Sequence, residues 1–214
     1  MPAIQFTSQN STPEALILMF HGVGASPESL RPLAEFLHRT NPDLEIRIPA
    51  GFAPSTISPA GFQWFDVIGV TEENRPARVQ QVMPVFDQLI RQQAESAGVS
   101  LDKVVLLGFS QGTIMSLEWL KQSPDAVAGI IGIAGRFAEL PQQTPACATP
   151  VCTIPVCLIH GEADQVIDST YAQQSHQRLS ELGIPCELNL LPDTPHSITQ
   201  AMYPLMTDFL HKII

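Results

Sequence analysis

Short apolar segments alternate along the chain with longer segments whose apolar residues recur at helical spacing. The short segments that we predict as strands are Leu16–Phe20, Glu45–Ile48, Lys103–Phe109, Gly129–Ala134, Val156–His160 and Glu187–Leu191. The longer segments that we predict as helices are Pro76–Ala97, Ser169–Leu182 and Ser197–Ile213. The stretches Leu16–Phe20, Val104–Leu107 and Ile130–Ile133 are apolar on both faces, as central parallel strands covered by helices are. The pattern therefore predicts an α/β fold, with a mostly parallel central sheet and helices on both faces.

Prolines interrupt this pattern at a few places. Pro84 lies within Pro76–Ala97, where we expect it to kink the helix or to mark its true start. The segments Pro49–Pro59 and Pro141–Pro155 combine proline with small polar residues and are predicted as loops. Neither loop is long enough to divide the chain, so we expect a single domain over residues 1–214.

The chain is acidic, with 11 Lys and Arg residues against 21 Asp and Glu residues and a net charge of −10. Nucleic-acid phosphates and anionic lipid headgroups repel this charge, so we expect no nucleic-acid partner and no stable membrane anchoring. The longest apolar run, Ala15–Phe20, is far shorter than the ~20 residues of a membrane-spanning helix. The first residues lack the pattern of a signal peptide, so a cytoplasmic location is expected.

The cysteines show no metal-binding pattern. They are Cys147, Cys152, Cys157 and Cys186. Neither a Cys-x-x-Cys pair nor a histidine at zinc-ligand spacing accompanies them, so we expect no zinc site at these cysteines. In a reducing compartment they would be free thiols, with a Cys147–Cys152 disulfide as the alternative.

A candidate nucleophile follows the third predicted strand. The segment Gly108-Phe109-Ser110-Gln111-Gly112 has the form Gly-x-Ser-x-Gly, with an apolar strand before it and a helical segment after it. In a sharp turn from strand to helix, the serine hydroxyl is exposed and small residues are needed two positions to either side. The amino end of the following helix also favours a developing oxyanion. The bare pattern occurs in structural turns too, but this context favours Ser110 as the nucleophile.

A serine nucleophile needs a histidine that accepts its proton. In the fold that this turn indicates, the order along the chain is serine, acid, histidine, each after a strand. His196 follows the predicted strand Glu187–Leu191 closely. His176 and His211 fall in predicted helices and His160 precedes the candidate acids, so we predict His196 as the base.

The acid that orients this histidine has three candidates: Glu162, Asp164 and Asp168. Asp168 lies where it would cap the next predicted helix. Asp164 lies on the loop after a strand, and we predict it as the catalytic acid. Asp193 is too near His196 in the sequence to come from a separate strand, although a local contact stays open.

An oxyanion hole for such chemistry uses two backbone amides. One is expected at Gln111, the residue after the candidate nucleophile. The other is expected at Val23, within His21-Gly22-Val23-Gly24, where the glycines let the backbone turn its amides inward. His21 precedes the nucleophile in the chain, so we expect it to hold this loop by hydrogen bonds rather than to act as the base.

Together these segments resemble the phospholipase/carboxylesterase family of α/β-hydrolases, which includes the acyl-protein thioesterases. The segments that carry the resemblance are His21-Gly22-Val23-Gly24, Trp64-Phe65-Asp66, Gly108-Phe109-Ser110-Gln111-Gly112, His160-Gly161-Glu162-Ala163-Asp164-Gln165-Val166-Ile167 and His196-Ser197-Ile198. The resemblance implies an α/β-hydrolase fold and a serine esterase that hydrolyses carboxylic esters or thioesters through an acyl-enzyme, without a metal or an organic cofactor. Within the family it indicates a carboxylesterase of the bacterial type.

The chain departs from the family pattern beside three of these segments. Many members have an acidic or a further glycine residue where Ala25 stands, and glycine is common at the positions of Thr113 and Pro195. None of these departures removes a candidate catalytic group. They leave the acyl pocket and the substrate open.

The resemblance also makes Trp64 and Phe65 candidates for substrate binding. Packing of Trp64 in the core is the alternative, and Asp66 is expected to brace its loop by hydrogen bonds. No insertion long enough for a large lid is present, so we expect a minimal lid, an open site and tolerance of short to medium acyl chains.

Other functions stay open alongside this one. The same triad would serve a lactone or peptide hydrolase. A non-catalytic ligand-binding protein on this scaffold would usually have lost a triad residue, and none is lost here. A metal-dependent hydrolase using His160, Glu162 and Asp164 would need three ligands on one short loop, which is poor geometry. We therefore expect a small-molecule ester as the partner; the acidic charge argues against anionic acyl-CoA, and an apolar surface around the site would be compatible with a homodimer.

Overall fold

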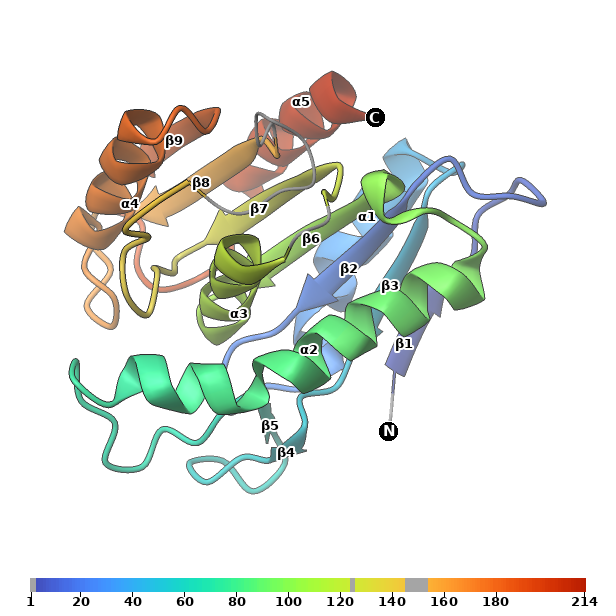
Figure 1. Ribbon diagram of the computed structural model, residues 1–214. Coiled ribbons are helices and arrows are strands. Elements are labelled where there is room, and N and C mark those ends of the chain that lie inside the picture. The colour runs from blue at the N-terminus through green and yellow to red at the C-terminus, as the bar shows by residue number, and fades with distance from the viewer. Residues whose placement is uncertain (1–2, 124–125, 145–153) are drawn as a thin grey trace.

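A seven-stranded sheet forms the centre of the computed structural model, which describes residues 3–123, 126–144 and 154–214 (Figure 1). The strands of the sheet are β1 (Ala3–Phe6), β2 (Leu16–Phe20), β3 (Glu45–Pro49), β6 (Val104–Phe109), β7 (Gly129–Ile133), β8 (Val156–Gly161) and β9 (Cys186–Leu191). They lie in the order β1-β3-β2-β6-β7-β8-β9, and all neighbours are parallel except β1 and β3. The helices are α1 (Arg31–Thr40), α2 (Arg75–Ala97), α3 (Gln111–Gln122), α4 (Thr170–Glu181) and α5 (Tyr203–Ile213). The short strands β4 (Ala53–Pro54) and β5 (Phe62–Gln63) form a separate pair.

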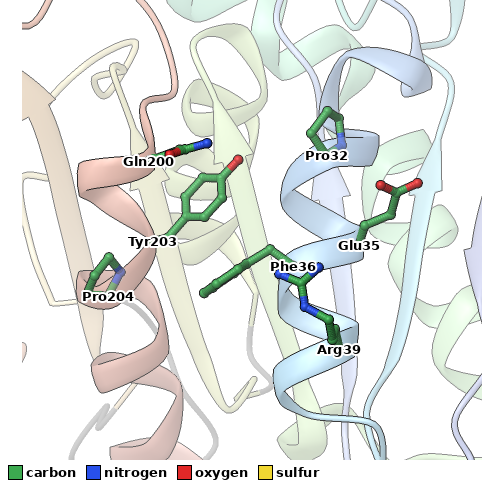
Figure 2. Close-up of a pocket in the computed structure, with 7 residues that line it drawn as sticks. All are labelled: Pro32, Glu35, Phe36, Arg39, Gln200, Tyr203 and Pro204. Carbon is green, nitrogen blue, oxygen red and sulfur yellow. The ribbon is translucent and has the colours of Figure 1, made fainter.

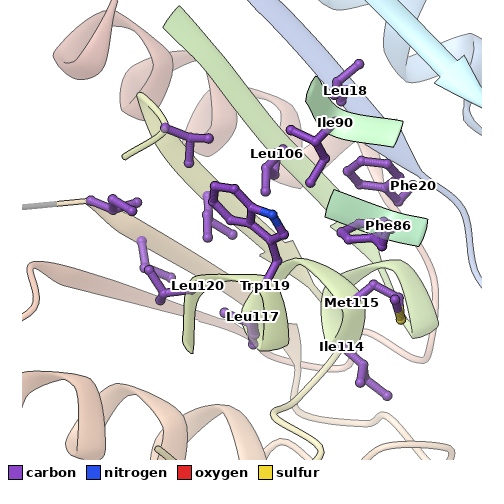
Figure 3. Close-up of a cluster of buried hydrophobic side chains, with 14 of the residues drawn as sticks. Leu18, Phe20, Phe86, Ile90, Leu106, Ile114, Met115, Leu117, Trp119 and Leu120 are labelled. Atoms are coloured by element: carbon purple, nitrogen blue, oxygen red, sulfur yellow. The ribbon is translucent and has the colours of Figure 1, made fainter. Parts of the chain in front are cut away.

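Helices cover both faces of the sheet, which explains why its central strands are apolar throughout. Along β2, Leu16, Leu18 and Phe20 pack in one layer with residues of α2, α3 and α4. Ile17 and Met19 pack in the other layer, with residues of α1 and α5. Figure 3 shows the first layer, where side chains of α3 meet those of the sheet and of α2. Successive side chains of a strand point to opposite faces, so a strand between two such layers buries every residue.

The structure confirms the predicted fold class, and the six predicted strands agree with it to within one residue at each end. The structure differs from the predicted helices at two points. Helix α2 runs through Pro84, so of the two alternatives for this proline, a kink or the start of the helix, the start is excluded. Residues 197–199 belong to a loop rather than to the last helix, and a single 3-10 turn covers Gln200–Met202 before α5. Pro204 stands in the first turn of α5, where its missing amide hydrogen costs nothing.

The two proline-rich segments are described to different extents. Pro49–Pro59 is a loop apart from the last residue of β3 and the short strand β4. Most of Pro141–Pro155 lies outside the described residues, and so does the alternative disulfide between Cys147 and Cys152. Among the helices in the described ranges, none is both long and apolar enough to cross a membrane.

The two cysteines that the structure describes are free thiols on neighbouring strands. Cys157 packs in the layer of α1 and α5, whereas Cys186 packs against the layer of α2, α3 and α4. Burial raises the pKa of each thiol to about 12, so both are protonated at neutral pH.

The carboxyl ends of the parallel strands meet at one edge of the sheet, and the predicted site residues follow four of these ends. Val23 follows β2 and Ser110 follows β6. Asp164 follows β8 and His196 follows β9. Residues far apart in the sequence are thus brought to the same edge by topology alone.

The turn between β6 and α3 has no room for side chains at its two glycines. A Cβ atom on Gly112 would lie 2.0 Å from the carbonyl oxygen of Phe20. A Cβ atom on Gly108 would lie 2.4 Å from main-chain atoms at the start of α3. Both contacts are with backbone, which cannot rotate away as a side chain can. The glycines therefore allow α3 to begin directly against β2 and β6.

We expect Gly112→Ala to destabilise the protein by at least the ~1–3 kcal/mol typical of overpacking, because the backbone of the sheet or of the helix must move. Gly183→Ala is the matched control. Gly183 has a positive φ of 73°, but a Cβ there would meet nothing within 4 Å, so only the backbone cost of about 1–2 kcal/mol applies. Urea unfolding of both variants measures the difference. A smaller loss for Gly112→Ala than for Gly183→Ala would contradict the steric explanation.

Candidate active site

Ser110 occupies the turn between β6 and α3 with φ of 54° and ψ of −113°, a backbone conformation that residues other than glycine rarely adopt. Its amide donates to the carbonyl of Ile133 at the end of β7 (2.9 Å). Its carbonyl accepts from the amide of Ile114 in the first turn of α3 (3.1 Å). These two hydrogen bonds hold a strained residue between strand and helix, as is common at functional sites.

The structure brings the three predicted triad residues into one chain of hydrogen bonds. Nε2 of His196 lies 2.9 Å from Oγ of Ser110, and Nδ1 of His196 lies 2.7 Å from Oδ2 of Asp164. A carboxylate can only accept, so Nδ1 carries the proton and Nε2 accepts from the serine hydroxyl. The imidazole also packs beside the ring of Phe109, with 5.1 Å between centroids. This geometry can activate a serine hydroxyl as a nucleophile.

Both oxygens of the Asp164 carboxylate accept hydrogen bonds. Oδ1 accepts from the amides of Val166 (2.8 Å) and Ile167 (2.9 Å), while Oδ2 faces His196. Burial alone would raise the pKa of Asp164, but the bonds from His196 and from the two amides outweigh it and hold the pKa below its ordinary value. Asp164 is therefore ionised at neutral pH and fixes the orientation of the imidazole.

Close backbone contacts join the loop that carries Asp164 to the loop that carries His196. The amide of Glu162 donates to the carbonyl of Leu191 (2.9 Å), and the amide of Ala163 donates to the carbonyl of Thr194 (3.1 Å). A Cβ atom on Gly161 would lie 2.0 Å from the carbonyl oxygen of Thr194. Glycine at this position therefore permits the close approach of the loops that carry Asp164 and His196.

The other acidic candidates lie outside this chain of hydrogen bonds. Glu162 is exposed, and Asp168 is exposed and accepts from the amide of Thr170 at the start of α4 (2.9 Å). His160 is buried, with Nε2 3.2 Å from Oδ2 of Asp164 and 2.8 Å from a carbonyl of the same loop. Within the described ranges, no three or more His, Cys, Asp or Glu side chains are grouped so as to hold a metal ion.

Val23 and Gln111 present backbone amides at the same edge of the sheet. Gln111 is the first residue of α3, so the helix offers its amide no carbonyl one turn earlier. In the described part of the chain, the amide of Val23 has no hydrogen-bond acceptor. The residue before Val23 lies against Ser110, since a Cβ on Gly22 would come within 3.3 Å of the Cβ of Ser110. Unpaired amides next to a serine hydroxyl are the donors that an oxyanion hole requires.

His21 holds the loop after β2, as predicted. Its Nε2 accepts from the amide of Gly51 (3.0 Å), so Nδ1 carries the proton and donates to the carbonyl of Gly22 (2.8 Å). Burial lowers the pKa of His21 and the bond to Gly22 opposes this only in part, so the ring is neutral. Gly24, with φ of 79°, donates from its amide to the carbonyl of Phe62 (2.9 Å) and ties the same loop to β5.

The side chain of Gln111 joins the turn between β6 and α3 (residues 108–112, here called the elbow) to the segment Trp64-Phe65, a role that the motif alone does not reveal. Oε1 accepts from the amide of Trp64 (2.8 Å), and Nε2 donates to the carbonyl of Phe65 (2.8 Å). The indole of Trp64 is 1 % exposed and donates to the carbonyl of His21 (2.8 Å). This burial favours packing and support of the site over direct contact of Trp64 with a substrate. The sequence signal for this role was the glutamine in a turn expected to be buried, because a buried side-chain amide needs hydrogen-bond partners.

Asp66 braces the following loop, as predicted. Its Oδ1 accepts from the hydroxyl of Thr56 (2.9 Å) and from the amide of Ile68 (3.0 Å). These hydrogen bonds hold the pKa of Asp66 below its ordinary value, and the bond from the Ile68 amide has the largest effect. Asp66 therefore ties the segment Trp64-Phe65 to a residue before it, Thr56, and to a residue after it, Ile68.

A separate cavity of about 460 Å³ lies between α1 and α5, in the other layer of helices (Figure 2). Its lining residues are Pro32, Glu35, Phe36, Arg39, Gln200, Tyr203 and Pro204. The rings of Phe36 and Tyr203 meet across it, with centroids 4.7 Å apart. None of the predicted site residues lines this cavity, so its size does not make it the active site.

The mostly parallel sheet, with its strand-turn-helix at β6 and α3, defines the α/β-hydrolase fold. Residues 2–214 match the family described as Phospholipase/Carboxylesterase. The chain belongs to this family, as its motifs predicted, and it is a hydrolase of the carboxylesterase type.

Esterases and thioesterases are among the known proteins to which the chain is similar. Esterase YpfH of Escherichia coli (strain K12) is 35% identical over 207 residues, which cover 97% of this chain and 86% of that protein. Acyl-protein thioesterase 1 homolog 1 of Dictyostelium discoideum is 25% identical over 212 residues, which cover 95% of this chain and 92% of that protein. The crystal structure of esterase PE8 matches with a TM-score of 0.90 at 25% identity, and the match covers 99% of this chain and 98% of the PE8 chain.

We expect Asp164→Asn to lower kcat/KM for ester hydrolysis by on the order of 10⁴, the loss seen when a triad acid becomes an amide. The side-chain oxygen of the asparagine can still accept from the backbone amides of Val166 and Ile167, so the fold should persist. Asp168→Asn is the matched control on the same loop, and it should leave kcat/KM unchanged. Comparable losses in the two variants would contradict the assignment of Asp164.

Stability towards acid should also depend on Asp164. Because its pKa is lowered in the folded state, ionised Asp164 stabilises the fold above the ordinary carboxyl pKa of about 4, and this contribution disappears as the pH falls through the lowered value. The unfolding free energy of the native protein minus that of Asp164→Asn should therefore shrink on acidification through this range. Urea unfolding at a series of acidic pH values measures it, and a difference that stays constant or grows would refute the linkage.

Proposed function

We propose that the protein is a serine carboxylesterase in which Ser110, His196 and Asp164 form the catalytic triad. The observation that carries this proposal is the continuous chain of hydrogen bonds from Oγ of Ser110 through His196 to Asp164, at the turn between β6 and α3. The match of residues 2–214 to one enzyme family supports a single α/β-hydrolase domain over the whole chain. The substrate class is a small-molecule ester with a short or medium acyl chain.

In the first half-reaction Oγ of Ser110 attacks the acyl carbonyl carbon while Nε2 of His196 takes the hydroxyl proton. The carbonyl oxygen becomes an oxyanion, and the amides of Val23 and Gln111 donate to it. The bond from the carbon to the leaving oxygen or sulfur then breaks, and His196 gives its proton to the leaving group. Ionised Asp164 stabilises the imidazolium that exists between these proton transfers.

In the second half-reaction water attacks the acyl-Ser110 ester. His196 takes a proton from the water, the same two amides hold the oxyanion, and the bond between the acyl carbon and Oγ breaks. Oγ regains its proton from His196, and the carboxylic acid leaves. Two moderate barriers thus replace one high barrier.

The surroundings of the site support broad tolerance of the acyl chain. Ile57, Ile68 and Val166 are large apolar residues with more than half of their surface exposed. Val166 adjoins Asp164, Ile68 follows the Trp64-Phe65 segment, and Ile57 approaches the loop after β2. An apolar, open rim favours short and medium acyl groups without selecting one length closely. Thioesters are the second candidate substrates, because a relative of this chain carries the name acyl-protein thioesterase.

We expect the native protein to hydrolyse p-nitrophenyl acetate, butyrate and octanoate in the presence of EDTA, and Ser110→Ala to lose about 10⁴-fold or more of kcat/KM. Ser180→Ala is the control, because Ser180 is exposed on α4 and its hydroxyl donates to the carbonyl of His176 in the same helix. Equal rates for native protein and Ser110→Ala would overturn the serine mechanism. A strong preference for p-nitrophenyl palmitate would overturn the proposed chain-length range, and faster turnover of peptide or lactone substrates would change the substrate class.

A further inference from the structure

A second cavity, of about 150 Å³, adjoins the proposed triad. Its lining residues are Glu72, Arg75, Ile114, Arg136, Val166, Ile167 and Tyr171. The amide of Ile114 donates to the carbonyl of Ser110, and the amides of Val166 and Ile167 donate to Asp164. Residues of this cavity are therefore bonded directly to the nucleophile and to the acid.

Two guanidinium groups share a single carboxylate on the wall of this cavity. Arg75 lies 2.7 Å from Oε1 of Glu72, and Arg136 lies 2.7 Å from Oε2 and 3.2 Å from Oε1. Partial burial would raise the pKa of Glu72, but the two arginines outweigh it and hold the pKa below its ordinary value. The lining of the cavity thus carries an excess positive charge, in a chain whose net charge is −10.

Arg136 is held in place by contacts that do not involve Glu72. Its guanidinium stacks 3.6 Å from the centroid of the Tyr171 ring, and its Nε donates to the carbonyl of Phe137 (3.0 Å). The side chain of Arg136 is 12% exposed, whereas that of Glu72 is 60% exposed. An ion pair with an exposed carboxylate contributes little to stability, so Glu72 is the partner that can move away at small cost.

We infer that this cavity is a subsite for an anionic group of the substrate, namely an ester that bears a carboxylate a few bonds from the scissile carbonyl. The substrate carboxylate would take the place of the Glu72 carboxylate between Arg75 and Arg136. A guanidinium fixed in advance binds a carboxylate through paired N–H donors at low entropic cost. The apolar part of the substrate would lie against Ile114 and Val166. This inference rests on the proposed function, since it names a substrate of that same site.

A purely structural clamp makes a different prediction from a carboxylate subsite. If the ion pairs only tie the start of α2 to the loop after β7, Arg136→Gln and Glu72→Gln each break the clamp and should act in the same direction. If the cavity binds a substrate carboxylate, Arg136→Gln removes the binding group, whereas Glu72→Gln removes a competitor. The two variants should then shift the preference for anionic esters in opposite directions.

The test compares charged and neutral esters of matched size. For a carboxylate in the leaving group the pair is 3-acetoxybenzoate and its methyl ester. For a carboxylate in the acyl group the pair is mono-p-nitrophenyl adipate and p-nitrophenyl methyl adipate. The measured quantity is the ratio of kcat/KM for the anionic ester to that for the neutral ester. The pair that responds shows on which side of the scissile bond the carboxylate lies.

For one of the two pairs we expect Arg136→Gln to lower this ratio by about 10-fold to 100-fold, the range for losing a hydrogen bond to a charged group. Arg136→Lys, which keeps the charge but not the paired donors, should have an intermediate ratio, and Glu72→Gln should raise the ratio. Arg31→Gln is the control, because Arg31, the first residue of α1, forms an ion pair with Glu28 of the preceding 3-10 turn and does not line this cavity. It should leave the ratio unchanged.

Three results would overturn the inference. The ratio could be the same in all variants, or Arg136→Gln and Glu72→Gln could shift it in the same direction. Arg31→Gln could also lower it as much as Arg136→Gln does. In each case hydrolysis of the neutral esters would leave the proposed function standing. Failure of the native protein to hydrolyse any ester would instead overturn the proposed function itself.

Discussion

The absence of side chains at Gly108 and Gly112, on either side of Ser110 in the turn between β6 and α3, is the constraint on which the rest of the site depends. The backbone of Gly112 approaches the carbonyl of Phe20 closely, so α3 begins directly against β2, and Ser110 before it has a positive φ of 54°. The same contact brings the loop after β2, with the amide of Val23, next to Ser110. One close backbone approach thus positions both the hydroxyl and the candidate oxyanion donors.

Thr113 shows how this turn accommodates a larger residue than is common in the family. Its hydroxyl lies 2.7 Å from the carbonyl of Gly108 and accepts from the amide of Ile133 (3.0 Å), so it links β6 to β7. Its methyl group occupies the space in which a Cβ of Gly132 or Gly135 would stand, at 2.7 Å and 2.5 Å. The side chain of Thr113 therefore fits because Gly132 and Gly135 have no side chains, and the geometry of the elbow is retained.

The fold and the triad candidates were predictable because their signals are local. A few neighbouring residues are enough to recognise an apolar strand, a serine between glycines or a histidine after the last strand. The chain topology then brings these elements together. The signals that were missed depend on partners distant in the sequence. The Gln111 side chain bonds to Trp64 and Phe65, and no spacing rule connects these positions. The edge strand β1 was missed for a different, local reason, because it has only four residues, too few for a period to be recognised.

Charge shows the same limit of sequence reasoning in another form. A net charge of −10 argues against anionic partners if the charges are spread evenly, but a substrate responds to the field where it binds. Folding places Arg75 from the start of α2 and Arg136 from the loop after β7 around one exposed carboxylate, in a cavity that Ile114 also lines, and the amide of Ile114 donates to the carbonyl of Ser110. Low-dielectric walls strengthen such a local field, whereas solvent and salt screen distant surface charges. The acidic surface and a cationic subsite are therefore compatible, and the subsite has the stronger influence on which ester binds.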